Sequence, residues 1–333
     1  MTQATTKSVE LICPVHRAPL QAGDGGLTCA QDGTTYPIAD GIPVLLPNPD
    51  DRARVLGTDW SQSKQDASPL DFYNQTRDHD QYCRTELNTV RQDVERWLAS
   101  AQIDGPTLEI GSGKGALQGT GGDAYVAVDY SFTALRQYIK PHYQRVCATA
   151  EQLPFPDNSF RFLFTIAALE HVPNADVAFD EIHRVLKPGG VAYLHPAWHC
   201  TQYNCDGIPV RPYKDLTPAQ RWVKLTLPLR QRGVIKAAAA LPARALRRLS
   251  WSLKGRRATD MRFRRLRPDY QTFWISDSDA ASRLDSHEGC LYFQSRGYDV
   301  LSPGAAVFRQ LMCRHEPVVV RKPATATQEP AAG

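Results

Sequence analysis

The chain has 333 residues, of which 42% are hydrophobic, so it can fill a sizeable core and is not disordered throughout. Its 39 basic and 35 acidic residues leave a net charge of +4, which excludes a uniformly polycationic nucleic-acid binder.

We expect the chain to carry neither a secretory signal nor a membrane-spanning segment. Its first ten residues lack the apolar stretch of a secretory signal, and no run of about 18 apolar residues occurs. The eight cysteines do not have the spacing of a disulfide scaffold. We therefore expect a cytoplasmic protein with reduced thiols.

Residues 1–49 predict a small β-rich module, because short apolar runs alternate with turns rich in Gly, Asp and Pro. Cys13 and His16 form a C-x-x-H pair, and Cys29 and Asp32 form a C-x-x-D pair. Two such pairs facing each other would give zinc four ligands. The segment resembles small bacterial zinc-ribbon-like proteins and the N-terminal zinc domain of some rRNA guanine methyltransferases. The alternative is a metal-free knuckle whose cysteines are buried.

Residues 50–69 are polar and charged, and we expect a linker there. Residues 70–216 are expected to form the main domain. Its first part has apolar residues at helical spacing, namely Leu87, Val90, Val94, Trp97 and Leu98.

The stretch T-L-E-I-G-S-G-K-G, from Thr107 to Gly115, runs from an apolar strand into a glycine-rich turn. A second strand follows at residues 125–128 and leads into Asp129. A doubly wound α/β sheet builds a nucleoside site in this way, at the carboxyl ends of its strands. Glu109 beside the turn would repel a pyrophosphate and suits a ligand that carries an ammonium group.

Three further segments follow in order: A-E-Q-L-P-F-P-D-N-S-F from residue 150, L-E-H-V-P-N from residue 169, and E-I-H-R-V-L-K-P-G-G from residue 181. Together with the glycine turn and Asp129, they resemble the class I S-adenosylmethionine-dependent methyltransferases of the type 11 kind over residues 108–196. The resemblance implies a Rossmann-like doubly wound sheet, S-adenosylmethionine as cofactor, and methyl transfer.

The resemblance also implies which residues hold the cofactor. Glu109 would reach the methionine ammonium, and Asp129 would accept the ribose hydroxyls. The expected cofactor-binding residues are Glu109, Gly111, Ser112, Gly113, Gly115, Asp129, Tyr130, Ala150, Glu151 and Leu169. The family normally has a helix after the glycine turn, but the few residues between Gly115 and Tyr125 predict a loop.

Two histidines are catalytic candidates. His171 follows the fourth strand and can accept a proton near neutral pH. The alternative is that it and Glu170 only shape the cofactor pocket. His195 follows the fifth strand. The substrate-binding candidates are Trp198, His199, Tyr203 and Arg211, with core packing as the alternative for Trp198.

Residues 217–268 predict a basic helical insertion, since residues 244–267 hold nine Arg, one Lys and one Asp. It is interpreted as a pair of solvated helices, as a nucleic-acid patch, or as a membrane-surface helix with leucines and Trp251 opposite the arginines. Residues 269–321, with a polar cluster at Asp277, Asp279 and Arg283, would complete the core and cap the substrate. Residues 322–333 predict a disordered tail.

We expect a methyltransferase that acts on a small-molecule, glycan or lipid-linked acceptor, with peripheral membrane contact through the basic insertion. One alternative is an rRNA or tRNA base methyltransferase, which the N-terminal module and the Arg-rich segment suggest. Another is a non-catalytic scaffold that binds the cofactor. The intact glycine turn argues against the scaffold.

Overall fold

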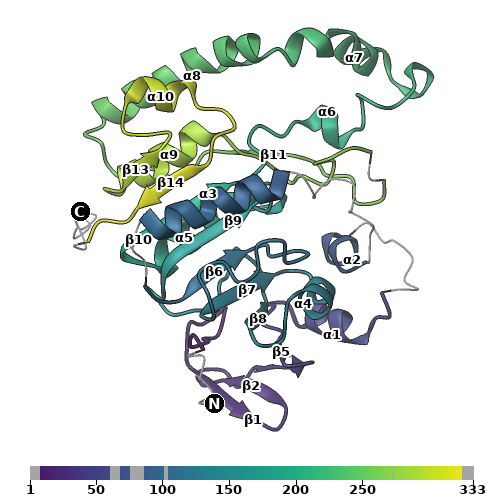
Figure 1. The fold of residues 1–333 in the computed structure, drawn as a ribbon. Helices are drawn as coiled ribbons and strands as arrows, with labels where there is room; N and C mark the ends of the chain where they lie inside the picture. The colour runs from purple at the N-terminus through teal and green to yellow at the C-terminus, as the bar shows by residue number, and fades with distance from the viewer. Residues whose placement is uncertain (1–7, 61–67, 76–85, 101–103, 273, 325–333) are drawn as a thin grey trace. The chain divides into compact units, whose positions relative to one another are not determined.

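The computed structural model describes residues 8–60, 68–75, 86–100, 104–272 and 274–324 (Figure 1). The chain divides into two compact units. Unit 1 comprises Met1–Ile166 and Val177–Tyr193, and unit 2 comprises Ala167–Asp176 and Leu194–Gly333. Parts of the predicted linker and tail, residues 61–67 and 325–333, lie outside the described residues.

Unit 1 is built around parallel strands. These are β6 (Thr107–Ile110), β7 (Tyr125–Asp129), β8 (Gln144–Cys147), β9 (Phe160–Ile166) and β10 (Leu186–His195), whose last two residues belong to unit 2. Their spatial order is β10-β9-β6-β7-β8, and β6 pairs in parallel with both β7 and β9. This is the strand order of a doubly wound sheet, so the predicted fold class is confirmed.

The strands of unit 1 read as near-continuous apolar runs because both faces of the sheet are covered. All four residues of β6 are buried, as are the first four of β7. The helices that contribute to unit 1 are α1 (Pro49–Gly57), α2 (Pro69–Asn74), α3 (Glu86–Ser100), α4 (Phe132–Tyr138) and α5 (Ala175–Val185). Helix α3 contains the apolar residues for which the sequence predicts helical spacing.

Helix α1 lies inside the segment that was expected to be a linker. The Asn48 side chain accepts the Asp50 N–H at 3.0 Å, and Pro49 occupies the first helical position. The N-cap asparagine and the proline after it are the sequence signals for this helix. The polar composition of the segment led to the prediction of a linker instead.

The connection from β6 to β7, residues 111–124, consists of turns and contains no helix or strand, as the sequence predicts. Gly121 shows why glycine is needed in this loop. Its φ is +88°, and a Cβ there would lie 2.2 Å from the Thr107 Oγ1.

The N-terminal part of unit 1 is the predicted β-rich module. An antiparallel sheet contains β1 (Leu20–Gly23), β2 (Gly26–Cys29) and β3 (Thr35–Tyr36), and a hairpin contains β4 (Ile38–Ala39) and β5 (Ile42–Pro43). Val44 forms a parallel bridge with Cys147 of β8, and the Leu45 N–H donates to the Cys147 carbonyl at 2.8 Å. The module therefore continues the edge of the parallel sheet.

Unit 2 combines short strands with helices. Its strands form two antiparallel pairs, β11 (Arg264–Arg265) with β12 (Ser282–Arg283) and β13 (Asp299–Ser302) with β14 (Val318–Arg321). Its helical segments are η2 (Leu169–His171), α6 (Gln202–Cys205), η3 (Tyr213–Asp215), α7 (Pro218–Arg230), α8 (Gly233–Leu253), α9 (Ser286–Ser295) and α10 (Val307–Met312). The predicted helical insertion corresponds to α7 and α8. Across the described ranges, no helix is both long and apolar enough to span a bilayer.

Candidate functional site

The glycine turn after β6 is held by backbone hydrogen bonds to β7. The Gly111 and Ser112 N–H groups both donate to the Val128 carbonyl, at 2.8 and 3.2 Å. At Gly115 φ is +68°, which L side chains rarely adopt, and a Cβ would lie 3.2 Å from the Tyr138 carbonyl oxygen, so a larger residue would strain the turn. The turn is thereby fixed against the carboxyl end of β7.

Asp129 ends β7 and connects it to the glycine turn. One carboxylate oxygen accepts the Gly113 N–H, and the other accepts the Ser131 N–H, each at 2.7 Å. Each oxygen keeps a second lone pair, so the same carboxylate can also accept ligand hydroxyls. Burial raises the pKa of Asp129. The structure thus brings Asp129 together with Gly111, Ser112 and Gly113.

Glu109 has a partner that the sequence reasoning missed. The Tyr125 hydroxyl donates to the Glu109 carboxylate, and Glu109 is buried. Burial raises the pKa of Glu109 to about 8, against the opposing effect of the Tyr125 hydrogen bond. The register of β6 and β7 explains this contact. Glu109 pairs with Ala127, and Tyr125 lies two residues from Ala127 on the same face of the sheet.

The segment after β8 lies next to Asp129, since the Ala148 N–H donates to the Asp129 carbonyl at 3.0 Å. Ala150 is buried, and the Glu151 N–H donates to the Thr149 Oγ1 at 3.2 Å. These contacts place the predicted residues Ala150 and Glu151 near the end of β7.

Tyr130, another predicted cofactor residue, hydrogen-bonds through its side chain to Asp51 of α1. The helix that replaces part of the expected linker therefore contacts the residue that follows Asp129. No local sequence pattern predicts this contact, because about 80 residues separate Asp51 from Tyr130.

A second group of predicted residues lies in unit 2, where η2 carries Leu169 and His171. Leu169 is fully buried. The His171 Nδ1 lies 3.2 Å from the Asp279 Oδ2, and its Nε2 lies 3.8 Å from the Glu170 Oε1. The Ala197 N–H donates to that same Glu170 oxygen at 3.0 Å. The sequence analysis singled out Asp279 but did not connect it with His171.

The His171 cluster is strongly electrostatic. Burial alone would lower the pKa of His171, but the carboxylates of Asp279, Glu170 and Asp277 raise it. Burial raises the pKa of Glu170 to about 7. An imidazole held between carboxylates can accept and pass on a proton. The ligand atoms of Glu170, His171 and Asp277 also lie within 4.8 Å of one another, as in metal sites.

His195, Trp198 and His199 make contacts that hold the fold of unit 2. The His195 Nε2 lies 2.9 Å from the His315 carbonyl, and the Trp198 Nε1 donates to the Glu316 carbonyl at 3.2 Å. Burial lowers the pKa of His199 to about 4, and its Nε2 lies 3.3 Å from a guanidinium nitrogen of Arg244. Trp198 is buried, as core packing requires, and the substrate-binding role of Trp198 and His199 stays a prediction.

Tyr203 and Arg211 lie elsewhere in unit 2. Tyr203 packs against a hydrophobic cluster made by Ile208, Leu216 and Leu227. The Arg211 guanidinium lies 5.4 Å from the centre of the Trp274 ring and donates to the Asp206 and Asp215 carbonyls. The substrate-binding role of these residues stays a prediction.

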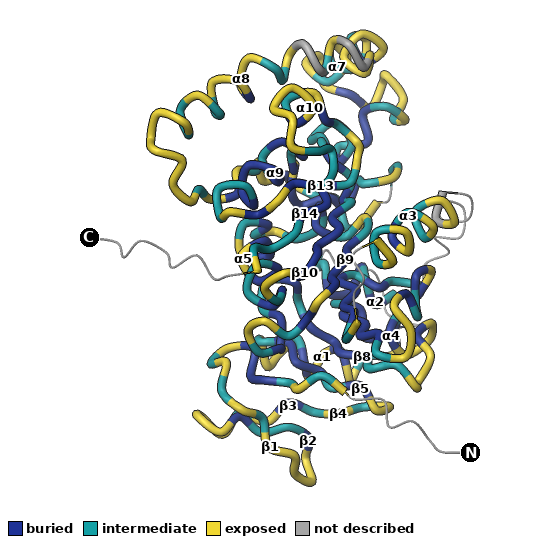
Figure 2. The backbone as a smooth tube through the Cα atoms, turned by 60° about the vertical axis from the view of Figure 1, so that its left-hand side comes forward, coloured by how far each residue is buried: buried dark blue, intermediate teal, exposed yellow. Residues whose placement is uncertain are grey.

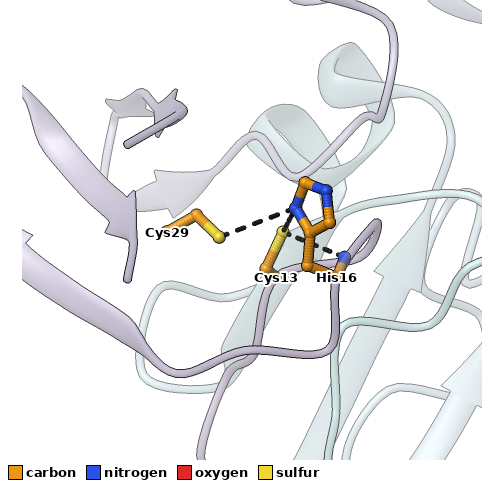
Figure 3. A group of neighbouring side chains, drawn as sticks. All are labelled: Cys13, His16 and Cys29. Atoms are coloured by element: carbon orange, nitrogen blue, oxygen red, sulfur yellow. Dashed lines mark hydrogen bonds between the residues drawn. The ribbon is translucent and has the colours of Figure 1, made fainter. Parts of the chain in front are cut away.

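The N-terminal module brings three predicted metal ligands together (Figure 3). The Sγ atoms of Cys13 and Cys29 each lie 3.8 Å from the His16 Nδ1. Tetrahedral zinc with ordinary bond lengths would place sulfur and nitrogen ligands about 3.6 Å apart, so these three donors fit zinc. The Asp32 Oδ2 lies 3.7 Å from the same Nδ1, but Asp32 also accepts hydrogen bonds from Thr34.

Comparison with known proteins gives a family match for part of the chain. Residues 108–194 match the model of a methyltransferase domain. Sterol 24-C-methyltransferase erg-4 of Neurospora crassa is 27% identical over 141 residues, which cover 42% of this chain and 37% of that protein. The ubiquinone/menaquinone biosynthesis C-methyltransferase UbiE of Brucella abortus is 36% identical over 110 residues, which cover 28% of this chain and 40% of that protein.

Among solved structures, phosphoethanolamine N-methyltransferase 2 of Haemonchus contortus, in complex with S-adenosyl-L-methionine, is 20% identical with a TM-score of 0.28. The match covers 40% of this chain and 31% of that one. The chain spans about two fifths of the length of the two curated relatives.

Proposed function

We propose that this chain, whose residues 108–194 form a class I S-adenosylmethionine-dependent methyltransferase domain, transfers methyl groups to a small-molecule acceptor. One observation carries the proposal. The glycine turn hydrogen-bonds to Asp129 at the carboxyl end of β7, with Glu109 on the neighbouring strand β6. A doubly wound sheet binds nucleosides at that edge.

The residues of this site fit the cofactor. Two acids and a tight glycine turn match a ligand with ribose hydroxyls and an ammonium group. Asp129 keeps lone pairs for the ribose hydroxyls, and Glu109 supplies the anion for the ammonium. When bound, S-adenosylmethionine supplies an electrophilic methyl group on its sulfonium.

The acceptor class is drawn from the chemistry of the relatives. Their names refer to a sterol and to ubiquinone/menaquinone biosynthesis, which supports a small acceptor with apolar character. A lipid-linked precursor combines such character with a polar group that can be methylated. We therefore prefer a lipid-linked acceptor to a free glycan.

We assign proton removal from the acceptor to His171, with Asp279 as its positioning residue. The Asp279 carboxylate and carbonyl both lie near the His171 Nδ1, so a proton on Nδ1 would make Nε2, which lies 3.8 Å from the Glu170 Oε1, the accepting atom. His195 is the weaker candidate, because its Nε2 faces a backbone carbonyl.

We also propose that Cys13, His16 and Cys29 hold a structural zinc ion, with Asp32 as the fourth ligand. The spacing of the three donors supports this, and both cysteines are buried. The ion would stabilise the module and would take no part in methyl transfer.

Calorimetry of S-adenosylmethionine binding tests the cofactor site. The wild-type protein should bind with micromolar affinity, about −8 kcal/mol. Asp129→Asn should raise Kd at least about tenfold by weakening the acceptor for the ribose, whereas the exposed Asp123→Asn should not. Equal affinities of wild type and Asp129→Asn would refute the site assignment. Binding without formation of S-adenosylhomocysteine from any lipid, glycan or RNA acceptor would favour the scaffold.

A further inference from the structure

An apolar stripe runs along the outside of α8. Its members recur every three or four residues and so share one face of the helix. They are Ile235, Ala239, Pro242, Leu246, Leu249 and Leu253, and all six are exposed. Figure 2 shows exposed stretches recurring along α8. The stripe is about 27 Å long, and Leu253 is 78% exposed.

The arginines of α8 lie on the opposite face of the helix from the stripe and contact other parts of unit 2. Arg244 pairs with Asp285 at 2.7 Å, and Arg247 pairs with Glu288 at 3.2 Å. Arg248 donates to Gln294 at 2.6 Å. The two faces of α8 are therefore the reverse of those of an ordinary surface helix, since its arginines pack against the protein and its leucines face outward.

This arrangement corrects one detail of the sequence interpretation, which grouped Trp251 with the leucines. Trp251 is half-buried on the arginine side, where its Nε1 donates to the Arg257 carbonyl at 2.8 Å. Helical spacing agrees, because Trp251 follows Arg244 and Arg247 by seven and four residues.

Helix α7 carries a second, shorter stripe. Trp222, Leu225 and Leu229 share one face and are 63%, 63% and 54% exposed. Figure 1 shows α7 leading into α8, and we call residues 218–253 the α7–α8 arm. Apolar surface of this extent is unusual on a soluble monomer and marks a docking surface.

The charge of the arm and its surroundings indicates which kind of partner it binds. Residues 216–259 contain eleven Arg and Lys residues and no Asp or Glu. Six of these bases are exposed, namely Arg221, Arg230, Arg232, Lys254, Arg256 and Arg257. Two copies of such a surface would repel each other, which disfavours self-association through the arm. Leucine stripes gain nothing from RNA phosphates, but they gain from insertion among lipid headgroups.

We propose that the α7–α8 arm docks on an anionic lipid bilayer, with its leucines inserted among the headgroups and its exposed bases contacting lipid phosphates. The docking itself stands independently of the proposed methyl transfer. Its consequence rests on that function, because an enzyme held at the bilayer would meet an acceptor that is anchored in it.

Co-sedimentation of the full chain with vesicles tests the proposal. We expect binding to phosphatidylcholine vesicles that contain phosphatidylglycerol, and little binding to phosphatidylcholine alone. The triple variant Leu246→Gln, Leu249→Gln, Leu253→Gln should lower the partition coefficient at least about tenfold. Lys254→Gln, Arg256→Gln and Arg257→Gln should each cost about fivefold on anionic vesicles.

A matched control uses the same helix and the same substituent. Ala243→Gln, Ala245→Gln and Ser252→Gln change exposed positions off the stripe, so this triple variant should bind vesicles as the wild type does. Equal binding by the two triple variants would overturn the proposal. So would a concentration-dependent dimer without vesicle binding, or salt-sensitive tRNA binding without vesicle binding.

Calorimetry on the same preparations separates the two ideas. The stripe variant should bind S-adenosylmethionine with wild-type affinity, which also shows that it is folded. Vesicle binding by a wild type that does not bind the cofactor would refute the proposed function and leave the docking intact. Cofactor binding without vesicle binding would refute the docking and leave the proposed function intact.

Discussion

At the scale of single residues, Glu109 and Asp129 place two buried acids at one edge of the sheet. Burial raises the pKa of both, that of Glu109 to about 8, so Glu109 is mostly protonated at pH 7 without a ligand. A bound ammonium group would favour the ionised carboxylate. Ligand binding and proton loss are therefore coupled at Glu109.

This coupling predicts that S-adenosylmethionine binding at pH 7 releases up to about one proton. The release should shrink as the pH rises through about 8, where Glu109 is already ionised. Calorimetry in buffers of different ionisation enthalpy measures it. Glu109→Gln should abolish the buffer dependence and weaken binding. A wild-type enthalpy that is the same in all buffers would contradict the prediction.

The same shift predicts how stability depends on pH. A raised acid pKa means that the folded state holds its proton while the unfolded state has lost it. The contribution of Glu109 to the free energy of unfolding should therefore fall as the pH rises from about 4.5 to about 8, and then level off. Urea titrations of wild type and Glu109→Gln across this range measure the difference, which should be absent below about pH 4.

His171 predicts a pH-dependent rate. His171→Asn should lower kcat by roughly 100- to 10,000-fold with little change in cofactor affinity. Because neighbouring carboxylates raise the pKa of His171, Asp279→Asn should shift the rising limb of the pH–rate profile to lower pH. The exposed His142→Asn is the control. An unshifted pH–rate profile would mean that Asp279 has only a structural role. Loss of activity on treatment with a chelator would indicate a metal ion at this cluster.

At the scale of elements, α8 is attached to unit 2 mainly through its arginines. Arg244 is buried and donates to Asp285 and to the carbonyls of Leu311 and Cys313. One side chain thus connects α8, the N-terminus of α9 and the end of α10. This buried ion pair joins the arm to the rest of unit 2, together with the apolar packing of Leu227 of α7.

Arg244→Met should therefore destabilise unit 2 by about 3–5 kcal/mol, since it removes the guanidinium that neutralises the Asp285 carboxylate and donates to two carbonyls. Arg256→Met, at an exposed position, should change the free energy of unfolding by less than about 0.5 kcal/mol. Urea unfolding followed by circular dichroism compares the two variants. Equal stabilities would show that the pair contributes nothing net.

Local sequence patterns predicted β6 and β7, because their apolar runs and the glycine turn between them are short-range signals. The glycine turn and Asp129 could be predicted for the same reason. The pairing of His171 with Asp279 could not, since 108 residues separate them and only tertiary structure joins them. The burial of the α8 arginines could not be predicted either, because periodicity shows that a helix has two different faces but not which face packs against the protein.

At the scale of the whole molecule, the N-terminal module and the parallel sheet share a backbone bridge at Val44 and Cys147. The three metal-ligand candidates lie in the same module, so metal binding and sheet-edge protection are physically linked. The sequence indicated the cysteine pairs but gave no sign of the bridge, which joins residues far apart in the chain.

Elemental analysis should find about one zinc ion per chain. Cys29→Ser, or removal of the metal by a chelator, should lower Tm by roughly 5 °C or more, because metal binding adds to the folding free energy. Asp32→Asn should have a smaller effect in the same direction, and the exposed Asp24→Asn should have none. A metal-free protein with unchanged Tm would establish the metal-free knuckle instead.

The bridge between Val44 and Cys147 also has a consequence for synthesis on the ribosome. Val44 emerges about a hundred residues before its partner, a delay of about 5 to 20 seconds at ordinary elongation rates. During that time the module must hold itself together with its own hydrogen bonds and its cysteine–histidine cluster. Nascent chains stalled before Cys147 should therefore be protected from protease in zinc-replete lysate and cleaved in zinc-depleted lysate, which would make metal supply a condition for productive translation.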